Sequence, residues 1–274
     1  MSIKVEIKEQ SKTAKKEYPR CQILGDNSKK FYLYKYLDME VAIKCLKYNT
    51  LRFAQPSSWK DNYEKLYYTA DYSNVDKTGT FPKKLFACCF THNKASEASW
   101  KTYTYNKSGL GSRCVQFKIR RSKFRKALNR ALKGKGVAYE GLCNYELTDY
   151  NIRTIGEKLS QNYSEFIQNG IDLSGYLSLL LIKRQCFKYE NECRFFLIPD
   201  DEKSFIVSGT KKNVRHIDLN LNWKDFVEDI IVDEKCTETE LGMLKDVCSK
   251  AEIDVQIHRN NLYAVPIRLP IKIQ

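Results

Sequence analysis

The chain has 274 residues, of which 42% are hydrophobic, and it carries a formal net charge of +14 at pH 7. A sizeable core is therefore available. The longest largely apolar run, residues 177–182, is far shorter than the roughly 20 residues that a membrane helix requires. The first twenty residues are charged and lack the apolar region of a secretory signal. These features exclude a helical membrane protein and lead us to expect a cytoplasmic location.

The ten cysteines are scattered along the chain, and none of them forms a Cys-x-x-Cys pair. Because the chain is large and shows no export signal, we interpret them as reduced thiols rather than as a disulfide framework. Cys88 and Cys89 lie in an apolar run and are predicted to be core thiols. The three histidines, His92, His216 and His258, are far apart in the sequence, so no metal site is predicted.

Residues 1–30 are rich in charge and have little periodicity, which is typical of a loosely ordered leader. Beyond them, apolar spacing and capping residues predict the elements, with Asp38 and Ser122 as helix N-caps and Gly134 as a helix end. In chain order the first half is predicted to contain a strand over 31–37, a helix over 39–48, strands over 51–54 and 85–90, a helix over 95–105, a strand over 114–119 and a helix over 123–134.

In the second half, a strand is predicted over 137–147, followed by helices over 149–169 and 172–186. Next come a strand over 193–198, one or two strands that end at 219, and a strand over 226–232. The chain then has a helix that ends at 251 and strands over 253–257 and 262–267. The last helix begins with a capping box, because Glu240 follows Thr237 by three residues. Strands and helices alternate without a regular period, and there is no glycine-rich phosphate loop. We therefore predict an α+β fold, in which helices pack on a mixed, mainly antiparallel sheet in one domain.

The positive charge is concentrated in residues 98–139, which contain twelve Lys or Arg and no Asp or Glu. Such a stretch is typical of a protein that binds nucleic acid or another polyanion. The alternative is a solvated helix face that keeps the protein soluble. The candidate nucleic-acid-binding residues lie on or beside the helix predicted over 123–134, and they are Arg120, Arg121, Lys123, Arg125, Lys126, Arg130 and Lys133.

Several short clusters occur in a characteristic order: LYKYL at 33–37, TLRFAQPSSWKDNYE at 50–64, FACCFTHN at 86–93, SWKTY at 99–103, FKYENECRFFL at 187–197, VEDIIVDEKCTETELGMLKDV at 227–247 and IHRNNLYAVPIR at 257–268. By their order and spacing, the chain resembles the bacterial family catalogued as domain of unknown function 2971, over residues 31–268. The resemblance implies one α+β domain and no particular mechanism. At 59–62 the family usually has Phe-Asn-Asp-Pro, whereas this chain keeps only the acidic Asp61.

Glu190 and Glu192 are the candidate catalytic residues. At the start of a predicted strand they would point to one face together with Arg194, which is a candidate substrate-binding residue. Paired carboxylates can stabilise an oxocarbenium-like transition state. The spacing also resembles the Glu-x-Glu of ADP-ribosyltransferases. That resemblance implies that Lys35 and Tyr36 help to bind NAD, although those enzymes usually have Arg or His in place of Lys35. The alternative is a structural ladder of glutamate and arginine on a sheet face.

Three further sets are candidates for substrate binding or catalysis. Trp100 and Tyr103 lie one helical turn apart and can stack on a base, or they can simply pack a helix onto the sheet. Asp61 and Glu64 lie in a segment rich in proline and serine, where they can line a site or cap a helix. His92 follows an apolar strand and can serve as a general base, or as a hydrogen-bonded structural residue.

The leading hypothesis is an enzyme that transfers or hydrolyses the ribosyl unit of NAD and acts on nucleic acid or protein. Bacterial families of this kind are often toxins or phage-defence effectors, which is an analogy only. The alternatives are a non-catalytic nucleic-acid-binding or regulatory module, and a protein-interaction subunit in a defence operon.

Overall fold

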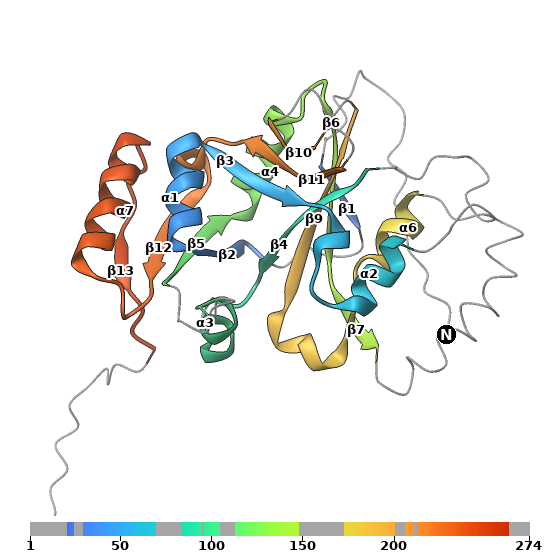
Figure 1. Ribbon diagram of the computed structural model, residues 1–274, viewed down its shortest axis with the longest axis horizontal. Coiled ribbons are helices and arrows are strands. Elements are labelled where there is room, and N and C mark those ends of the chain that lie inside the picture. Colours follow the sequence, from blue (N-terminus) through green and yellow to red (C-terminus); the bar gives the residue numbers. More distant parts are fainter. Residues whose placement is uncertain are drawn as a thin grey trace, which may run out of the picture.

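A mixed sheet of eleven strands organises the part of the chain that the structure, a computed structural model, describes (Figure 1). The described residues are 21–24, 30–69, 84–94, 96–104, 113–147, 173–200, 206–210 and 213–262. The main path of the sheet runs in the order β1 (Cys21–Leu24), β6 (Gly136–Leu142), β9 (Glu192–Pro199), β4 (Phe86–Thr91), β2 (Tyr32–Asp38), β5 (Cys114–Arg120), β12 (Val227–Val232) and β13 (Ile257–Arg259).

The two ends of this path are parallel pairs, β1 with β6 and β12 with β13, and its other pairs are antiparallel. A side branch of three antiparallel strands joins the path at β4, and it consists of β3 (Thr50–Ala54), β11 (Asn213–Asn220) and β10 (Ile206–Thr210). Helices pack on this sheet, so the predicted α+β class with a mixed, mainly antiparallel sheet is confirmed.

The sheet forks at β4. This strand pairs with β9 along its whole length, from Phe86 to Thr91. It pairs with β2 only at Thr91 and with β3 only at Ala87. The end of β4 at Thr91 is thereby fixed between β2 and the beginning of β9, where Thr91 lies opposite Glu192.

Helices cover both faces of the sheet. One face carries α1 (Met39–Tyr48), α4 (Arg121–Ala131), α7 (Glu238–Lys250) and the 3-10 turn η4 (Trp223–Asp225), which share the largest apolar core. The other face carries α2 (Asn62–Thr69), α3 (Glu97–Thr104) and α6 (Leu173–Leu179). Strand alternation supplies both cores: Phe195 and Leu197 of β9 face the first set of helices, whereas Phe196 faces the second. Figure 1 shows α1 and α7 side by side at one end, and α2 and α6 at the other.

Two predicted helix starts are confirmed, and one is wrong. The carboxylate of Asp38 accepts a hydrogen bond from the backbone N–H of Glu40 at the start of α1. Thr237 and Glu240 form the complete capping box of α7. Ser122, however, does not cap α4, because the helix already begins at Arg121 and has no side-chain cap.

The region that leads into β9 differs most from the prediction. The strand predicted over 137–147 is two strands in different sheets, β6 and β7 (Asn144–Leu147). The helix predicted over 172–186 ends at Leu179 and is followed by β8 (Ile182–Arg184), which pairs parallel with β7, and by the 3-10 helix η2 (Gln185–Glu190). On this path Lys183 lies in β8 rather than in a helix, and it is buried against carboxylates of α2 and β9.

Smaller differences concern the two ends of the chain. Cys21–Leu24 lies within the expected leader but forms strand β1, so these four residues belong to the sheet. The strand predicted over 253–257 is instead β13 at Ile257–Arg259. The helix predicted over 149–169, the end of the strand predicted over 262–267 and the rest of residues 1–29 lie outside the described residues. Within the described ranges, no helix is long and apolar enough to cross a membrane.

Candidate functional site

Five ionisable side chains converge on the face of the sheet that carries α2 and α6. They come from four elements that are far apart in the sequence, and we call them the charge network: Glu64 of α2, Lys183 of β8, Glu190 at the end of η2, and Glu192 and Arg194 of β9. Four of these side chains are less than a tenth exposed, and Glu190 is 17% exposed. Glu190 is therefore the member that solvent reaches most easily.

Lys183 lies among the three carboxylates. Its Nζ is 2.5 Å from Oε2 of Glu190, 2.8 Å from Oε2 of Glu192 and 3.3 Å from Oε1 of Glu64. A lysine ammonium has three N–H donors, so one buried ammonium can serve all three acids. Lys183 was not among the candidates predicted from the sequence. The one signal that pointed to it was a positive charge placed directly after the apolar run 177–182.

Arg194 closes the network on its other side. Its Nε and Nη2 donate to the two oxygens of Glu192, at 3.1 and 3.0 Å, and Nη2 also donates to Oε2 of Glu64 at 2.6 Å. Nη1 donates to the carbonyl oxygen of Leu180 at 2.6 Å. The ring of Trp59 packs over the guanidinium at 4.2 Å. Glu192 thus has both oxygens occupied and is held rigidly between two cations.

Glu190 reaches the same point by a different route from the one predicted. Glu192 and Arg194 share a face through strand alternation, as expected, but Glu190 ends the 3-10 helix η2 and Asn191 reverses the chain with a φ of 43°. This turn is tied to the end of β4. Thr91 Oγ1 donates to the carbonyl oxygen of Glu190 at 2.5 Å, and Asn93 Nδ2 donates to that of Tyr189 at 2.6 Å. The sequence clusters at 86–93 and 187–197 therefore build one local structure.

Burial and pairing act in opposite directions on the two candidate catalytic carboxylates. Burial alone would raise the pKa of Glu192, but Arg194 and Lys183 outweigh burial and lower its pKa below the ordinary value. For Glu190, burial has the largest effect, and its pKa is raised although Lys183 acts against this. For Lys183, burial would lower the pKa, yet the carboxylates of Glu192, Glu64 and Glu190 raise it, so the ammonium stays charged.

Two thiols and one phenol surround Glu192. Cys143 Sγ lies 3.7 Å from Glu192 Oε2, and the backbone N–H of Glu192 donates to the hydroxyl of Tyr145 at 2.7 Å. Burial, together with the negative charge of Glu192, raises the pKa of Cys143 and Cys89 well above the ordinary value. Because the thiolate is the reactive form, neither cysteine is suited to act as a nucleophile.

Arg184 lies beside the network and is more exposed. Its Nε donates to Asp61 Oδ2 at 3.1 Å, and its guanidinium packs over the rings of Tyr63 and Phe187 at 4.8 and 5.0 Å. The predicted site residue Asp61 thus adjoins the network through Arg184, while Glu64, three residues later, belongs to the network itself. The segment 59–64 supplies contacts to both arginines, Arg184 and Arg194.

Lys35 does not join the charge network. It lies between Leu33 and Leu37 on β2, and these leucines pack into the core under α1 and α4. Its Nζ donates to the carbonyl oxygen of Cys89 at 2.7 Å and lies 5.4 Å from the centre of the Phe90 ring. Lys35 therefore lies on the face of the sheet opposite to Glu192 and Arg194.

Tyr36 and Trp100 meet each other in a separate buried cluster. Their rings are 5.2 Å apart and almost perpendicular, and each side chain is 5% exposed. Tyr36 also accepts a hydrogen bond of 2.5 Å from Gln116 Nε2. This contact packs α3 onto the sheet. Tyr103 lies in α3, and the placement of its side chain falls outside the described residues.

His92 is held by the backbone. Its Nδ1 lies 2.9 Å from the carbonyl oxygen of Tyr32, which fixes Nδ1 as the protonated nitrogen. Burial lowers the pKa of His92 to about 4, and Lys30 and Arg121 act in the same direction. His92 is therefore neutral at pH 7.

Five of the seven candidate residues of the basic stretch form ion pairs with three carboxylates of other elements. Arg121 and Arg125 both hold the fully buried carboxylate of Glu140 on β6. The other pairs are Arg120 and Lys123 with Glu228, and Arg130 with Asp225. Of the seven candidate nucleic-acid-binding residues, only Lys126 and Lys133 form no ion pair within the described part of the chain.

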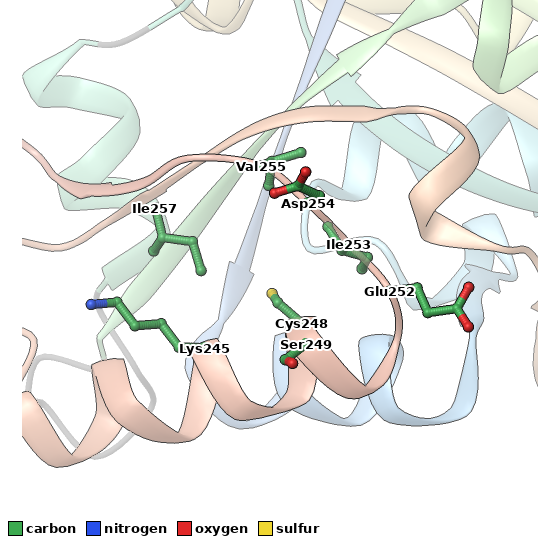
Figure 2. Close-up of a pocket in the computed structure, with 8 residues that line it drawn as sticks. All are labelled: Lys245, Cys248, Ser249, Glu252, Ile253, Asp254, Val255 and Ile257. Atoms are coloured by element: carbon green, nitrogen blue, oxygen red, sulfur yellow. The ribbon is translucent and has the colours of Figure 1, made fainter.

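The hollow drawn in Figure 2 is distant in sequence from the network. It has a volume of about 500 Å³, lies between α7 and the segment that follows it, and is lined by Lys245, Cys248, Ser249, Glu252, Ile253, Asp254, Val255 and Ile257. Figure 2 shows Lys245 and Glu252 at its two ends rather than pointing toward each other. Such a lining brings no set of polar groups together on a ligand.

Among the described residues, no group of three or more His, Cys, Asp or Glu side chains is placed to hold a metal ion. Comparisons of the chain with models of protein families, with curated proteins and with solved structures find no match. The resemblance to family 2971 therefore stays a prediction, and the charge network has to be interpreted from its own geometry.

Proposed function

We propose that this protein is an enzyme that cleaves the bond between ribose and nicotinamide in NAD, with Glu190 as the carboxylate at the reacting carbon. In this reaction the C1′–N bond breaks and its electron pair leaves with nicotinamide. The oxygen of water, or of an acceptor on nucleic acid or protein, then bonds to C1′ and loses its proton. The developing positive charge on the ribose needs a nearby anion.

The observation that carries this proposal is the charge balance of the network. Three carboxylates face two cations, so one negative charge is left over when all five groups are ionised. Glu192 and Glu64 each contact both Lys183 and Arg194, whereas Glu190 contacts only Lys183 and is the most exposed member. The surplus charge is therefore concentrated on the most exposed of the five side chains. Buried charge clusters of this kind are costly and are common at functional sites.

The positioning of Glu190 favours the same role. Catalytic carboxylates have to be held in place before the substrate arrives, because reorganisation during the reaction costs rate. Thr91 and Asn93 donate hydrogen bonds to the carbonyl oxygens of Glu190 and Tyr189, and these bonds fix the backbone there. Lys183 fixes the carboxylate of Glu190. In this proposal Glu192 has a supporting role and orients Lys183 and Arg194.

The alternative, a non-catalytic nucleic-acid-binding module, rests on the basic stretch alone. Five of its seven candidate residues already have acidic partners. No other contact among the described residues favours this alternative, so we do not propose it as a second function.

The test is incubation of the purified chain with labelled NAD, with and without DNA, RNA or cell extract, followed by mass spectrometry of released nicotinamide. We expect cleavage by wild type and by Glu40→Gln, whose side chain is 83% exposed on α1. Glu190→Gln should fold normally and release at least about a hundredfold less nicotinamide, as for loss of a catalytic group. Wild type that leaves NAD intact under every condition would overturn the proposal.

A further inference from the structure

The charge network has an outer layer built from its sequence neighbours. Three members of the network each have a neighbour in the sequence whose side chain reaches the surface. These neighbours are Tyr63 next to Glu64, Arg184 next to Lys183, and Tyr189 next to Glu190. The outer residues are 38%, 27% and 43% exposed, in the same order. One guanidinium and two aromatic rings thus come from residues directly next in sequence to members of the network.

Arg184 is the best-positioned of these outer residues. Asp61 accepts from its Nε at 3.1 Å, and the rings of Tyr63 and Phe187 hold the guanidinium plane from α2 and η2. Such contacts reduce the number of conformations that the side chain must give up when it binds a ligand. The guanidinium is therefore fixed in advance although part of it meets solvent.

Within the part of the chain that the structure describes, the contacts of Arg184 leave most of its donors unused. A guanidinium has five N–H groups, and the one on Nε is engaged by Asp61. The other four make no hydrogen bond to the described residues. Arg194, by contrast, uses Nε, Nη1 and Nη2 inside the network. A planar fork of free N–H groups matches the oxygens of a phosphate group better than a lysine ammonium does.

We propose that Arg184 is the phosphate-binding residue of a nucleotide subsite, which takes the pyrophosphate of a dinucleotide while its ribose lies toward Glu190. Exposed aromatic rings beside the guanidinium suit the planar base of the same ligand. This inference rests on the proposed function for the identity of the ligand. It adds the residue that selects a phosphorylated substrate over a free nucleoside.

The experiment is isothermal titration of the full chain with ADP, with inorganic pyrophosphate and with adenosine. Wild type should bind ADP and pyrophosphate and bind adenosine more weakly. Arg184→Gln should weaken ADP and pyrophosphate binding at least about tenfold, which is the size of effect that a charge-assisted hydrogen bond supports. Arg52→Gln is the matched control, because Arg52 is also paired with an aspartate, Asp218 at 2.7 Å, but lies on β3.

The outcomes separate the subsite from the proposed function. Three results would overturn the subsite, whatever the NAD cleavage assay gives. They are an ADP affinity that is unchanged in Arg184→Gln, an affinity that is lowered equally in Arg52→Gln, and no binding of ADP by wild type. Binding that depends on Arg184 in a protein that never cleaves NAD supports the subsite and overturns the enzyme. If Arg184→Gln does not fold, Arg184→Lys replaces it: binding about tenfold weaker supports the fork geometry, and unchanged binding overturns it.

Discussion

Lys183 and Glu192 are nine positions apart in the sequence, yet Lys183 Nζ lies 2.8 Å from Glu192 Oε2 beneath the face of the sheet. The 3-10 helix η2 separates them and turns the chain back, so that β8 and β9 present one cation and one anion to each other. Because both groups are buried, each depends on the other to offset the loss of its hydration. This pair makes the network a structural unit as well as a candidate active site.

Replacing Glu192 with glutamine should destabilise the fold. The substitution keeps the shape of the side chain but leaves Lys183 and Arg194 with one carboxylate fewer in a buried setting. We expect a loss of about 3–5 kcal/mol in the free energy of unfolding, measured by urea denaturation. The control Glu40→Gln should lose less than about 1 kcal/mol, because Glu40 is exposed. Equal stability of the two variants would contradict the burial of the network.

The pH dependence of stability should carry the signature of Glu192. Its pKa in the folded protein is lowered, whereas in the unfolded chain it is about 4.3. At pH values near and below 4.3 the unfolded chain binds the proton that the folded protein does not, so stability falls as the pH falls. The stability advantage of wild type over Glu192→Gln should be complete above about pH 5 and shrink steadily below it. Urea titrations at pH 7, 5 and 3 measure this, and an advantage that stays constant would contradict it.

Much of the fold was predictable from local signals in the sequence. The capped helices at 39–48 and 238–250 and the apolar strands around Phe90, Phe117 and Phe195 carry their own information about secondary structure. The paths of residues 143–147 and 180–191 were not predictable in this way. Short strands and 3-10 turns there are set by distant partners, such as the bond from the backbone N–H of Cys143 to the carbonyl oxygen of Glu192.

The candidate site was only half predictable for the same reason. Alternation along β9 places Glu192 and Arg194 together, and this part follows from the sequence alone. Lys183 and Glu64 join them only through tertiary packing. The segment of Glu64 made it a candidate site residue, but the sequence does not show that Lys183 and Glu64 meet Glu192 and Arg194. Lys35 was assigned to the site by resemblance, but the alternation of β2 places it with Leu33 and Leu37 on the other face.

The capping box of α7 should have a measurable effect on stability. Thr237 Oγ1 accepts from the backbone N–H of Glu240, and Glu240 Oε2 accepts from that of Thr237. We expect Thr237→Ala to lose about 0.5–2 kcal/mol in urea denaturation. Thr239→Ala, in the first turn of the same helix, is the matched control and should change stability by less than about 0.5 kcal/mol. Similar losses in both variants would contradict the capping role, because alanine has a higher helix propensity than threonine and propensity alone would not destabilise the helix.

The last prediction concerns the basic stretch and its affinity for nucleic acid. Affinity that arises from phosphate contacts falls with salt, and the slope of log K against log salt is about −0.9 for each phosphate neutralised on duplex DNA. Because only Lys126 and Lys133 among the seven candidate residues form no ion pair within the described ranges, we expect a slope no steeper than about −2. Fluorescence anisotropy with labelled duplex DNA at several salt concentrations measures it.

Variants separate binding from folding in this experiment. Replacing Arg121 and Arg125 with glutamine should destabilise the protein, because both hold the buried carboxylate of Glu140. That double variant would therefore lose DNA binding for reasons unrelated to contact with DNA. Lys126→Gln combined with Lys133→Gln should fold like wild type and remove most of the salt-dependent binding. If the slope is much steeper than −2 and survives this double substitution, the ion pairs on α4 must open to bind phosphate. The nucleic-acid-binding module would then replace the enzyme as the better hypothesis.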